Sequence, residues 1–352
     1  MRRSATIYDI ARETGLSHTT VSQALRDSAC VKEETRKRVH QVASRLGYRR
    51  NLSAAQLRVG HSHKIALIVP WQFDLQVALH HELQHLLQKH GYDLVVYPVL
   101  SPDERQDVFE QILASGYDGV VTMLYSFSQL RPHIHLFAAR HCPVAIVGTP
   151  YDAELAPGII GFDSTDMSGL HCALQKLFAL GHTKILHAIG EDQTTSPHNR
   201  LVCDEVGKIA PPGWPTEIFL KAGTTPDSAA GYELAARILK ERPEATAIQC
   251  PNDLFACGLI RGFNDLGVRV PEDFSVVGSE NLGLCEYMTP RLASISVGEV
   301  HAGRQIVESL LEHIREDEWS DLAYQFELKA EFHCRESVAP PRKGLLTSPL
   351  TK

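Results

Sequence analysis

The sequence predicts two unlike parts, an all-α head with a helix-turn-helix and an α/β body of two doubly wound lobes. Charge separates the two parts, because residues 1–60 carry 12 Lys/Arg against five Asp/Glu, whereas residues 61–352 carry 23 against 37. Helix start and stop signals at short spacing mark the basic part. In the acidic part, short apolar runs alternate with helical stretches. A chain of 352 residues is long enough for two or three domains.

The basic head has the spacing of a helix-turn-helix. Thr6, with an acid three residues later, is a capping-box pattern that opens a first helix. Gly15 makes the turn, and Ser17 can cap a second helix. A third helix is predicted from about residue 33 and ends at Gly47, a residue type that suits a left-handed C-cap. We therefore expect three short helices around one small core in residues 1–48.

The second helix of such a unit enters the major groove of DNA, where its early outward side chains face the base edges. In this chain the predicted base-reading residues are His18, Thr19 and Gln23. Gln can bond adenine, Thr can touch a thymine methyl group, and His can donate to guanine. The predicted phosphate contacts are Thr20, Ser22 and Arg26. The basic charge agrees with this role, because each Lys or Arg that neutralises a phosphate releases counterions from the DNA and so favours binding. Charge alone would agree equally well with a solvent-exposed basic surface that binds nothing.

The acidic body has the rhythm of parallel βαβ units. Strands are predicted at 65–69, 94–99, 119–123 and 144–147 in one half, and at 185–189, 217–220, 247–249 and 275–278 in the other. Two doubly wound lobes are the simplest assembly of these elements. Because ligands of open α/β sheets bind beyond the carboxyl ends of the strands, we expect a small-molecule pocket between the lobes.

Several strings in the chain occur together in one known family. They are Thr6-Ile-Tyr-Asp-Ile-Ala, Gly15-Leu-Ser, Thr20-Val-Ser, Glu34-Thr-Arg, Leu46-Gly-Tyr48, Asn51, Leu57, Ala179-Leu-Gly-His182, Asn252-Asp-Leu254, Val270-Pro-Glu-Asp-Phe-Ser-Val-Val-Gly278, Thr289-Pro290 and Arg335-Glu-Ser337. Over nearly its whole length the chain resembles the lactose-repressor (LacI/GalR) family of bacterial transcription regulators. The resemblance implies a repressor that binds a pseudo-palindromic operator as a homodimer, with a tetramer left open, and that responds to a small-molecule effector, expected to be a sugar. An activator of the same family is the alternative.

The resemblance also implies how the domains are divided. Residues 49–60 are too short for a stable isolated helix, and the family's hinge helix implies that they fold on DNA, with Ala54 and Leu57 at the minor groove. For residues 61–336 the resemblance implies a periplasmic-binding-protein-like fold, with crossovers near Asp163, Pro290 and Asp321. This assigns 61–163 and 291–320 to the first lobe, 164–290 and 321–336 to the second, and 337–352 to a C-terminal tail.

By the same resemblance, the polar effector contacts fall on Asp163, Arg200, Asn252 and Glu280, and two aromatic side chains, Trp71 and Phe73, follow the first strand. Carboxylates and amides suit sugar hydroxyls, and an aromatic face suits sugar C–H groups. Structural roles stay open for several of them: core packing for the two aromatics, a helix cap for Asn252 and an ion pair for Arg200. Departures from the family pattern include Arg50, Gln23 and Arg26 in the head and Glu280, in place of an aspartate, in the body.

One motif points to a different class of protein. His81-Glu82-Leu83-Gln84-His85 satisfies H-E-x-x-H, the helical motif of zinc hydrolases. Helical periodicity places both histidines opposite the apolar stripe of that helix, toward solvent or a partner subunit, and the spacing identifies no third ligand. The eight cysteines form no C-x-x-C pair, which favours reduced thiols. We therefore expect no enzyme, no cofactor and no metal, and a cytoplasmic, nucleoid-associated protein, since no signal peptide or membrane span is evident.

Overall fold

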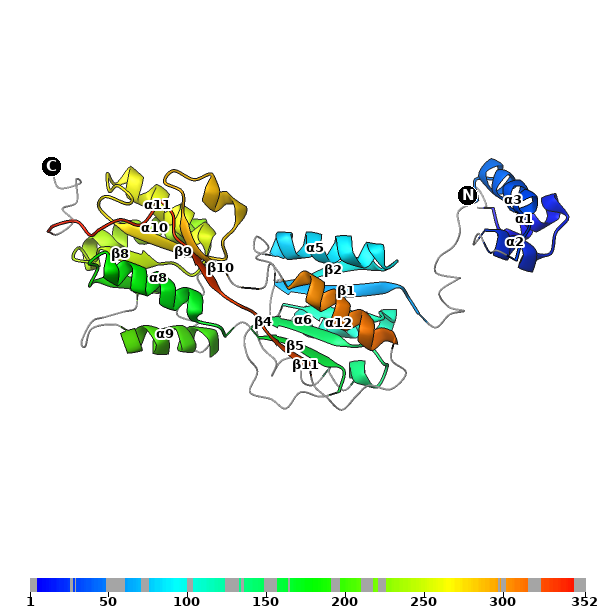
Figure 1. Cartoon of the computed structure of the whole chain (residues 1–352), viewed down its shortest axis with the longest axis horizontal. Helices are drawn as coiled ribbons and strands as arrows, with labels where there is room; N and C mark the ends of the chain where they lie inside the picture. The colour runs from blue at the N-terminus through cyan, green and yellow to red at the C-terminus, as the bar shows by residue number, and fades with distance from the viewer. Residues whose placement is uncertain are drawn as a thin grey trace. The chain divides into compact units, whose positions relative to one another are not determined.

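The chain divides into two compact units, residues 1–62 and 63–352, which Figure 1 shows as ribbons. The computed structural model describes residues 5–25, 28, 30–48, 61–70, 76–99, 104–123, 133, 136–148, 157–163, 165–190, 197–209, 218–220, 226–296, 298, 302–315 and 324–344. Among these, no helix is long and apolar enough to cross a membrane.

The head consists of the three predicted helices, α1 (Ile7–Thr14), α2 (His18–Ala24) and α3 (Glu33–Arg45). The capping box is formed, because Asp9 Oδ2 accepts hydrogen bonds from the Thr6 backbone N at 2.9 Å and from Thr6 Oγ1 at 2.7 Å. Gly15 makes the turn with a positive φ of 68°, a conformation that glycine adopts at little cost. The core of the head consists of Ile10, Val21, Ala24, Val31, Val39 and Ala43.

The first lobe of the body is a parallel sheet in the order β11-β5-β4-β3-β1-β2. Its strands are β1 (Lys64–Pro70), β2 (Asp93–Val99), β3 (Gly119–Thr122), β4 (Val144–Gly148), β5 (Ile159–Asp163) and β11 (Tyr324–Glu327). Helices α5 (Gln76–Lys89) and α12 (Gly303–Arg315) share one apolar cluster with the sheet. Helix α6 (Glu104–Ser115) packs in a second cluster, which contains the alternate residues of β1.

The second lobe has the strand order β12-β10-β9-β8-β6-β7, with only β12 antiparallel among the described pairs. Its strands are β6 (Ile185–Gly190), β7 (Ile218–Leu220), β8 (Ala247–Gln249), β9 (Ser275–Ser279), β10 (Ala293–Ser296) and β12 (Glu331–His333). A short 3-10 helix, η2 (Gly283–Glu286), follows β9. All eight strands predicted from the sequence are present in the two sheets, with bounds that differ by at most one residue.

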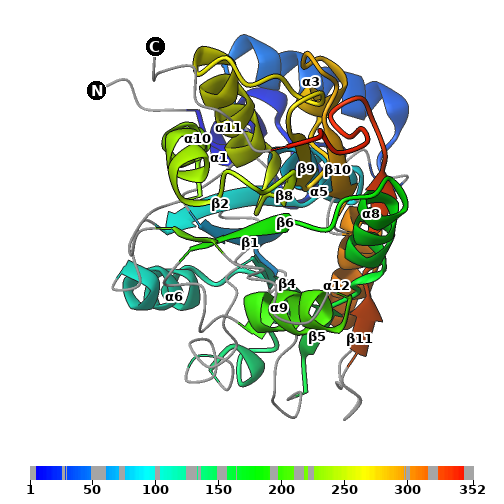
Figure 2. The same ribbon diagram turned by 90° about the vertical axis from the view of Figure 1, so that its left-hand side faces the viewer.

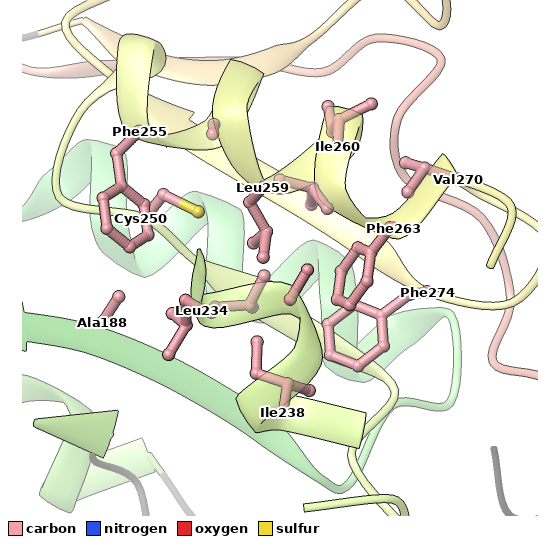
Figure 3. Packing of buried hydrophobic residues seen from close by; sticks show 14 of the residues in the cluster. Ala188, Leu234, Ile238, Cys250, Phe255, Leu259, Ile260, Phe263, Val270 and Phe274 are labelled. Atoms are coloured by element: carbon pink, nitrogen blue, oxygen red, sulfur yellow. The ribbon is translucent and has the colours of Figure 1, made fainter. Parts of the chain in front are cut away.

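Helices cover both faces of the second sheet (Figure 1, Figure 2). Helices α10 (Ser228–Glu241) and α11 (Asp253–Asp265) enclose the largest apolar cluster, in which Phe263 and Phe274 lie 4.9 Å apart between ring centroids (Figure 3). Helices α8 (Ser168–Ala179) and α9 (Pro197–Ile209) contribute to the cluster on the other face. Gly258 lets α10 and α11 approach closely, because a Cβ there would lie 1.8 Å from the Ser228 carbonyl oxygen.

Two of the three expected crossovers are displaced along the chain. Residues 291–320 were expected in the first lobe, but β10 pairs with β9 and β12 in the second. Residues 321–336 were expected in the second lobe, but β11 pairs with β5 in the first. The chain therefore crosses after Ser296 and again between β11 and β12, and not at Pro290 and Asp321. The small and polar residues of β10 carry no apolar run, so the sequence pattern did not reveal that strand.

The segment expected as a C-terminal tail from residue 337 begins inside the second lobe. Ser337 is fully buried, and its hydroxyl donates to the Val276 carbonyl oxygen at 2.6 Å. Arg342 donates to the carbonyl oxygens of Asp273, Pro243 and Ala245 at 2.6–2.7 Å. Up to Gly344, where the described residues end, this segment is a fixed part of the lobe.

Candidate functional site

The predicted base-reading side chains lie on one exposed part of the head. His18, Thr19 and Gln23 are exposed on α2, whereas Thr20 and Ser22 are half-buried. Ser17 begins this helix, because its Oγ accepts a hydrogen bond from the Thr20 backbone N at 3.1 Å. The remaining predicted phosphate contact, Arg26, and the hinge residues Ala54 and Leu57 lie outside the described residues.

Tyr8 is an exposed residue of the head that the sequence analysis did not single out. It is on α1, its side chain is 63 % exposed, and its ring centroid lies 5.9 Å from that of His18. Tyr8 therefore lies on the same exposed part of the head as His18, one of the predicted base-reading residues. The signal in the sequence was an aromatic at a position that the helical periodicity of α1 directs outward.

In the body, Asp163 ends β5, where the chain first leaves the first lobe. Its Oδ1 accepts from the Thr165 backbone N at 2.8 Å, and its Oδ2 from Gln325 Nε2 at 3.2 Å. Its backbone oxygen accepts from the Leu328 N at 2.7 Å. Asp163 thus links two crossover segments, and each carboxylate oxygen keeps a further lone pair for a ligand hydroxyl.

Asn252 and Glu280 follow the carboxyl ends of two neighbouring strands, β8 and β9. Asn252 caps α11, because its Oδ1 accepts from the Phe255 backbone N at 2.8 Å while its Nδ2 donates to the Pro226 carbonyl oxygen at 2.7 Å. The helix-cap interpretation of Asn252 is therefore confirmed. Glu280 is half-buried and has a φ of 97°, which is rare for a residue with a Cβ and typical of sites where the surrounding structure imposes the backbone.

A buried carboxylate holds the loop that carries Glu280. Asp253 Oδ1 accepts from Ser294 Oγ at 2.6 Å, and its Oδ2 accepts from the Leu282 backbone N at 2.7 Å. Burial raises the pKa of Asp253. Next to Glu280, Asn281 Oδ1 accepts from Arg335 Nη2 at 2.7 Å. Asp253 and Arg335 thus both hold the backbone that follows β9, through Leu282 and Asn281. These bonds keep Glu280 in one position, as ligand binding by this residue would require.

The other predicted effector residues are described less fully. Arg200 lies in the first turn of α9, but its side chain is outside the described residues, as are Trp71 and Phe73. The structure therefore places Asn252 and Glu280 at one edge of the second sheet, and Asp163 at the carboxyl end of a strand in the first sheet. In both sheets these residues follow the carboxyl ends of the strands, which is where ligands of open α/β sheets bind.

Comparison with known proteins bears on both units. The family model described as bacterial regulatory proteins, lacI family, matches residues 6–51, and a model of a periplasmic-binding-protein-like domain matches residues 174–338. A repressor named PurR from Haemophilus influenzae is 27 % identical over 345 residues, which cover 95 % of this chain and 98 % of that protein. The chain thus combines a helix-turn-helix domain of the lacI family of bacterial regulatory proteins with a periplasmic-binding-protein-like domain.

Further transcription regulators are similar in sequence or in fold. A transcriptional regulator named DegA from Bacillus subtilis is 28 % identical over 299 residues, 83 % of this chain and 86 % of that protein. A lac repressor dimer bound to operator and an anti-inducer has a TM-score of 0.77 at 21 % identity and covers 96 % of this chain and all of that one. A regulator named CelR in complex with cellobiose has a TM-score of 0.66 at 20 % identity, covering 95 % and 99 %. The predicted head and two-lobed body are confirmed.

The H-E-x-x-H motif does not assemble as a metal site among the described residues. His81 and His85 are exposed on α5. The Glu82 carboxylate lies against the start of α12, since a Cβ at Gly303 would fall 2.5 Å from Glu82 Oε2. The described residues contain no group of three His, Cys, Asp or Glu side chains placed to hold a metal ion. The relatives are named as transcription regulators.

Proposed function

We propose that this protein is a transcription repressor that binds a pseudo-palindromic operator as a homodimer and releases or tightens it in response to a sugar effector. The observation that carries the proposal is the capped helix α2, which exposes His18, Thr19 and Gln23 together. Base-edge readers of this kind occupy the first turns of a recognition helix. Such a regulator acts in the cytoplasm, on the nucleoid.

The repressor role and the sugar are supported by the related proteins. One relative is named a repressor, and a structural neighbour is a repressor dimer on its operator. Other neighbours hold cellobiose, ribose or lactose. In this chain, Asp163, Asn252 and Glu280 supply carboxylate and amide groups at strand ends, and these groups suit the hydroxyls of a sugar.

Two symmetry-related heads are proposed to read two half-sites, with the hinge residues Ala54 and Leu57 at the operator centre. Residues 1–60 carry seven more Lys and Arg than Asp and Glu. This positive charge attracts the DNA phosphates and supplies the part of the DNA affinity that does not depend on the base sequence. Binding should therefore weaken steeply as salt is raised, both on specific and on unspecific DNA.

Selection of bound sequences from random duplexes tests the proposal. We expect an enriched site with two inverted half-sites, and an affinity for it that changes when ribose, cellobiose or lactose is added. Enrichment of a single unrepeated site would contradict the dimer. Absence of any enrichment across a range of salt concentrations would contradict sequence-specific binding itself.

A further inference from the structure

Three polar side chains, the buried His187 and Gln249 and the half-buried Ser279, lie together beneath the carboxyl ends of the strands in the second sheet. His187 on β6 is in register with Gln249, the last residue of β8, and Ser279 is the last residue of β9. Alternate residues of a strand share a face, and Ile185, Ala247 and Val277, two positions earlier on each strand, pack with residues of α8 and α9. The three polar side chains therefore lie on the face that α8 and α9 cover.

The hydrogen bonds of this trio fix where its protons are. Gln249 Nε2 donates to the Cys250 carbonyl oxygen at 2.6 Å and to Ser279 Oγ at 3.0 Å. Since a carbonyl oxygen can only accept, the nitrogen of the amide must face Cys250, and Gln249 Oε1 faces the histidine. His187 Nδ1 lies 3.0 Å from that Oε1. An amide oxygen also only accepts, so Nδ1 carries the proton.

The other ring nitrogen of His187 is left as an acceptor. The imidazole is neutral, because burial lowers the pKa of His187 to about 4. A neutral imidazole has one N–H, so with the proton on Nδ1, Nε2 presents a lone pair. Nε2 is buried and has no hydrogen-bond partner within the described structure. A buried polar atom in that state costs free energy unless a donor is supplied to it.

The position of Nε2 relates it to the proposed effector site. Nε2 is a distal ring atom, so it extends from β6 into the layer between the sheet and the helices. Helix α9 belongs to this layer through Val202 and Val206, and the first turn of the same helix carries Arg200. Glu280 directly follows Ser279, and Asn252 follows Gln249 by three residues. The trio thus lies just below the strand ends that carry the predicted effector contacts.

We propose that His187 Nε2 is the acceptor at the floor of the effector site in the second lobe, and that it selects an effector with a hydroxyl or N–H donor at that position over one with a carboxylate or phosphate. The inference rests on the proposed function, because it refines the effector site assumed there. An anionic oxygen would face a lone pair without an intervening proton, whereas a neutral hydroxyl would satisfy Nε2. His187 and Gln249 are thereby specificity-determining residues.

The test combines a double variant with a tautomer measurement. In His187→Leu/Gln249→Leu both members of the pair become apolar, which leaves no buried partner unpaired between them and favours folding. Binding of ribose, cellobiose, lactose, gluconate and ribose 5-phosphate is measured by calorimetry on full-length wild type and variant. We expect a neutral sugar to bind wild type and to bind the variant about tenfold more weakly or worse. Nitrogen-15 NMR of wild type should show the His187 proton on Nδ1.

The buried His182 provides a matched control. It lies before β6, at the opposite edge of the same sheet, with Nδ1 2.9 Å from Thr246 Oγ1 and Nε2 2.7 Å from the Ala339 carbonyl oxygen. His182→Gln should lower the melting temperature without changing sugar affinity. The role of His187 would be overturned if the double variant bound sugar as tightly as wild type. It would also be overturned if the His187 proton were found on Nε2, or if wild type bound only gluconate or ribose 5-phosphate. If no probe binds wild type, the sugar effector of the proposed function fails, and this role fails with it.

Discussion

At the scale of single residues, buried histidines in this protein differ by what their ring nitrogens meet. His182 has partners on both nitrogens, whereas His187 has one on Nδ1 alone among the described residues. Burial lowers the pKa of both. Burial therefore keeps both histidines of this lobe neutral. Both ring nitrogens of His182 are hydrogen-bonded, whereas Nε2 of His187 is an acceptor without a donor among the described residues.

The pH dependence of stability follows from these lowered pKa values. Between its unfolded pKa of 6.5 and its folded pKa of about 4, His187 binds a proton more readily when the chain is unfolded. The free energy of unfolding should thus be highest above pH 6.5 and fall as the pH falls toward 4, by up to about 3 kcal/mol from this group. Urea unfolding at pH 7 and pH 5 measures the loss. The His187→Leu/Gln249→Leu variant should lose less over this interval; an equal loss would argue against a buried neutral imidazole.

Gln23 on α2 is one of the residues predicted to read bases, and this role can be tested by a single substitution. Gln23 is exposed on α2, and a bidentate contact to adenine contributes about 1–3 kcal/mol of discrimination. Gln23→Ala should weaken binding to the selected operator by that amount and leave binding to unrelated DNA unchanged, as measured by fluorescence anisotropy at fixed salt. Lys37→Ala, at an exposed position of α3 paired with Glu33, serves as the control outside the recognition helix. Equal losses on both DNAs with Gln23→Ala would remove it from the base-reading set.

At the scale of elements, the three crossovers between the lobes are joined to one another. Asp166, after β5, accepts from the Ala330 backbone N at 2.9 Å with Oδ2, and Ser168 Oγ donates to the Ala330 carbonyl oxygen at 2.8 Å. Ser296 Oγ accepts from the Glu331 backbone N at 3.2 Å. Gly298 is needed in this bundle, because a Cβ there would lie 2.7 Å from the Lys329 carbonyl oxygen. The strands that link the lobes thus form one connected unit.

Asp166→Ala should therefore destabilise this bundle of crossovers. The carboxylate accepts hydrogen bonds from the backbone nitrogens of Ala330 and Ser168, and although burial opposes it, these bonds and Lys329 lower the pKa of Asp166. We expect a loss of about 1–2 kcal/mol in the free energy of unfolding, because the partly buried backbone N–H of Ala330 loses its partner. Asp166→Asn, which retains one acceptor oxygen, should lose less. Chemical unfolding of both variants and of wild type measures these losses. Equal stability of all three proteins would contradict a stabilising role of the Asp166 carboxylate.

At the scale of the whole molecule, a DNA-reading head and a ligand-binding body coexist in one chain as separate compact units. If the effector changes the affinity for the operator, the operator must change the affinity for the effector by the same factor. The charge division agrees with this arrangement, because the basic residues are concentrated in the unit that meets phosphate and the acidic excess lies in the other.

Arg200→Ala separates the two activities. Because Arg200 is in α9 of the body, its removal should abolish the change in operator affinity caused by the effector, while operator binding without effector stays within about twofold of wild type. Titration of labelled operator with protein, with and without sugar, measures both. An unchanged response to sugar would exclude Arg200 from the effector site.

The amino-acid sequence was enough to predict the two-part architecture, the three head helices, eight of the strands and the exposed residues of α2. These features follow from local signals, namely caps, turns, charge and apolar periodicity, which act over a few residues. Four strands were not predicted, namely β5, whose apolar run is interrupted by Gly161, and β10, β11 and β12, which mix apolar and polar residues; all four are paired with neighbouring strands in the sheets.

Three features became known from the folded chain alone: the lobes to which β10 and β11 belong, the hydrogen bond from the helix cap Asn252 to Pro226, and the chain of hydrogen bonds through His187, Gln249 and Ser279. The hydrogen-bonded pairs His187–Gln249 and Gln249–Ser279 are 62 and 30 positions apart in the sequence. Strand pairing and proton placement depend on which groups meet in space, and a local pattern contains no information on which distant acceptor a donor will find.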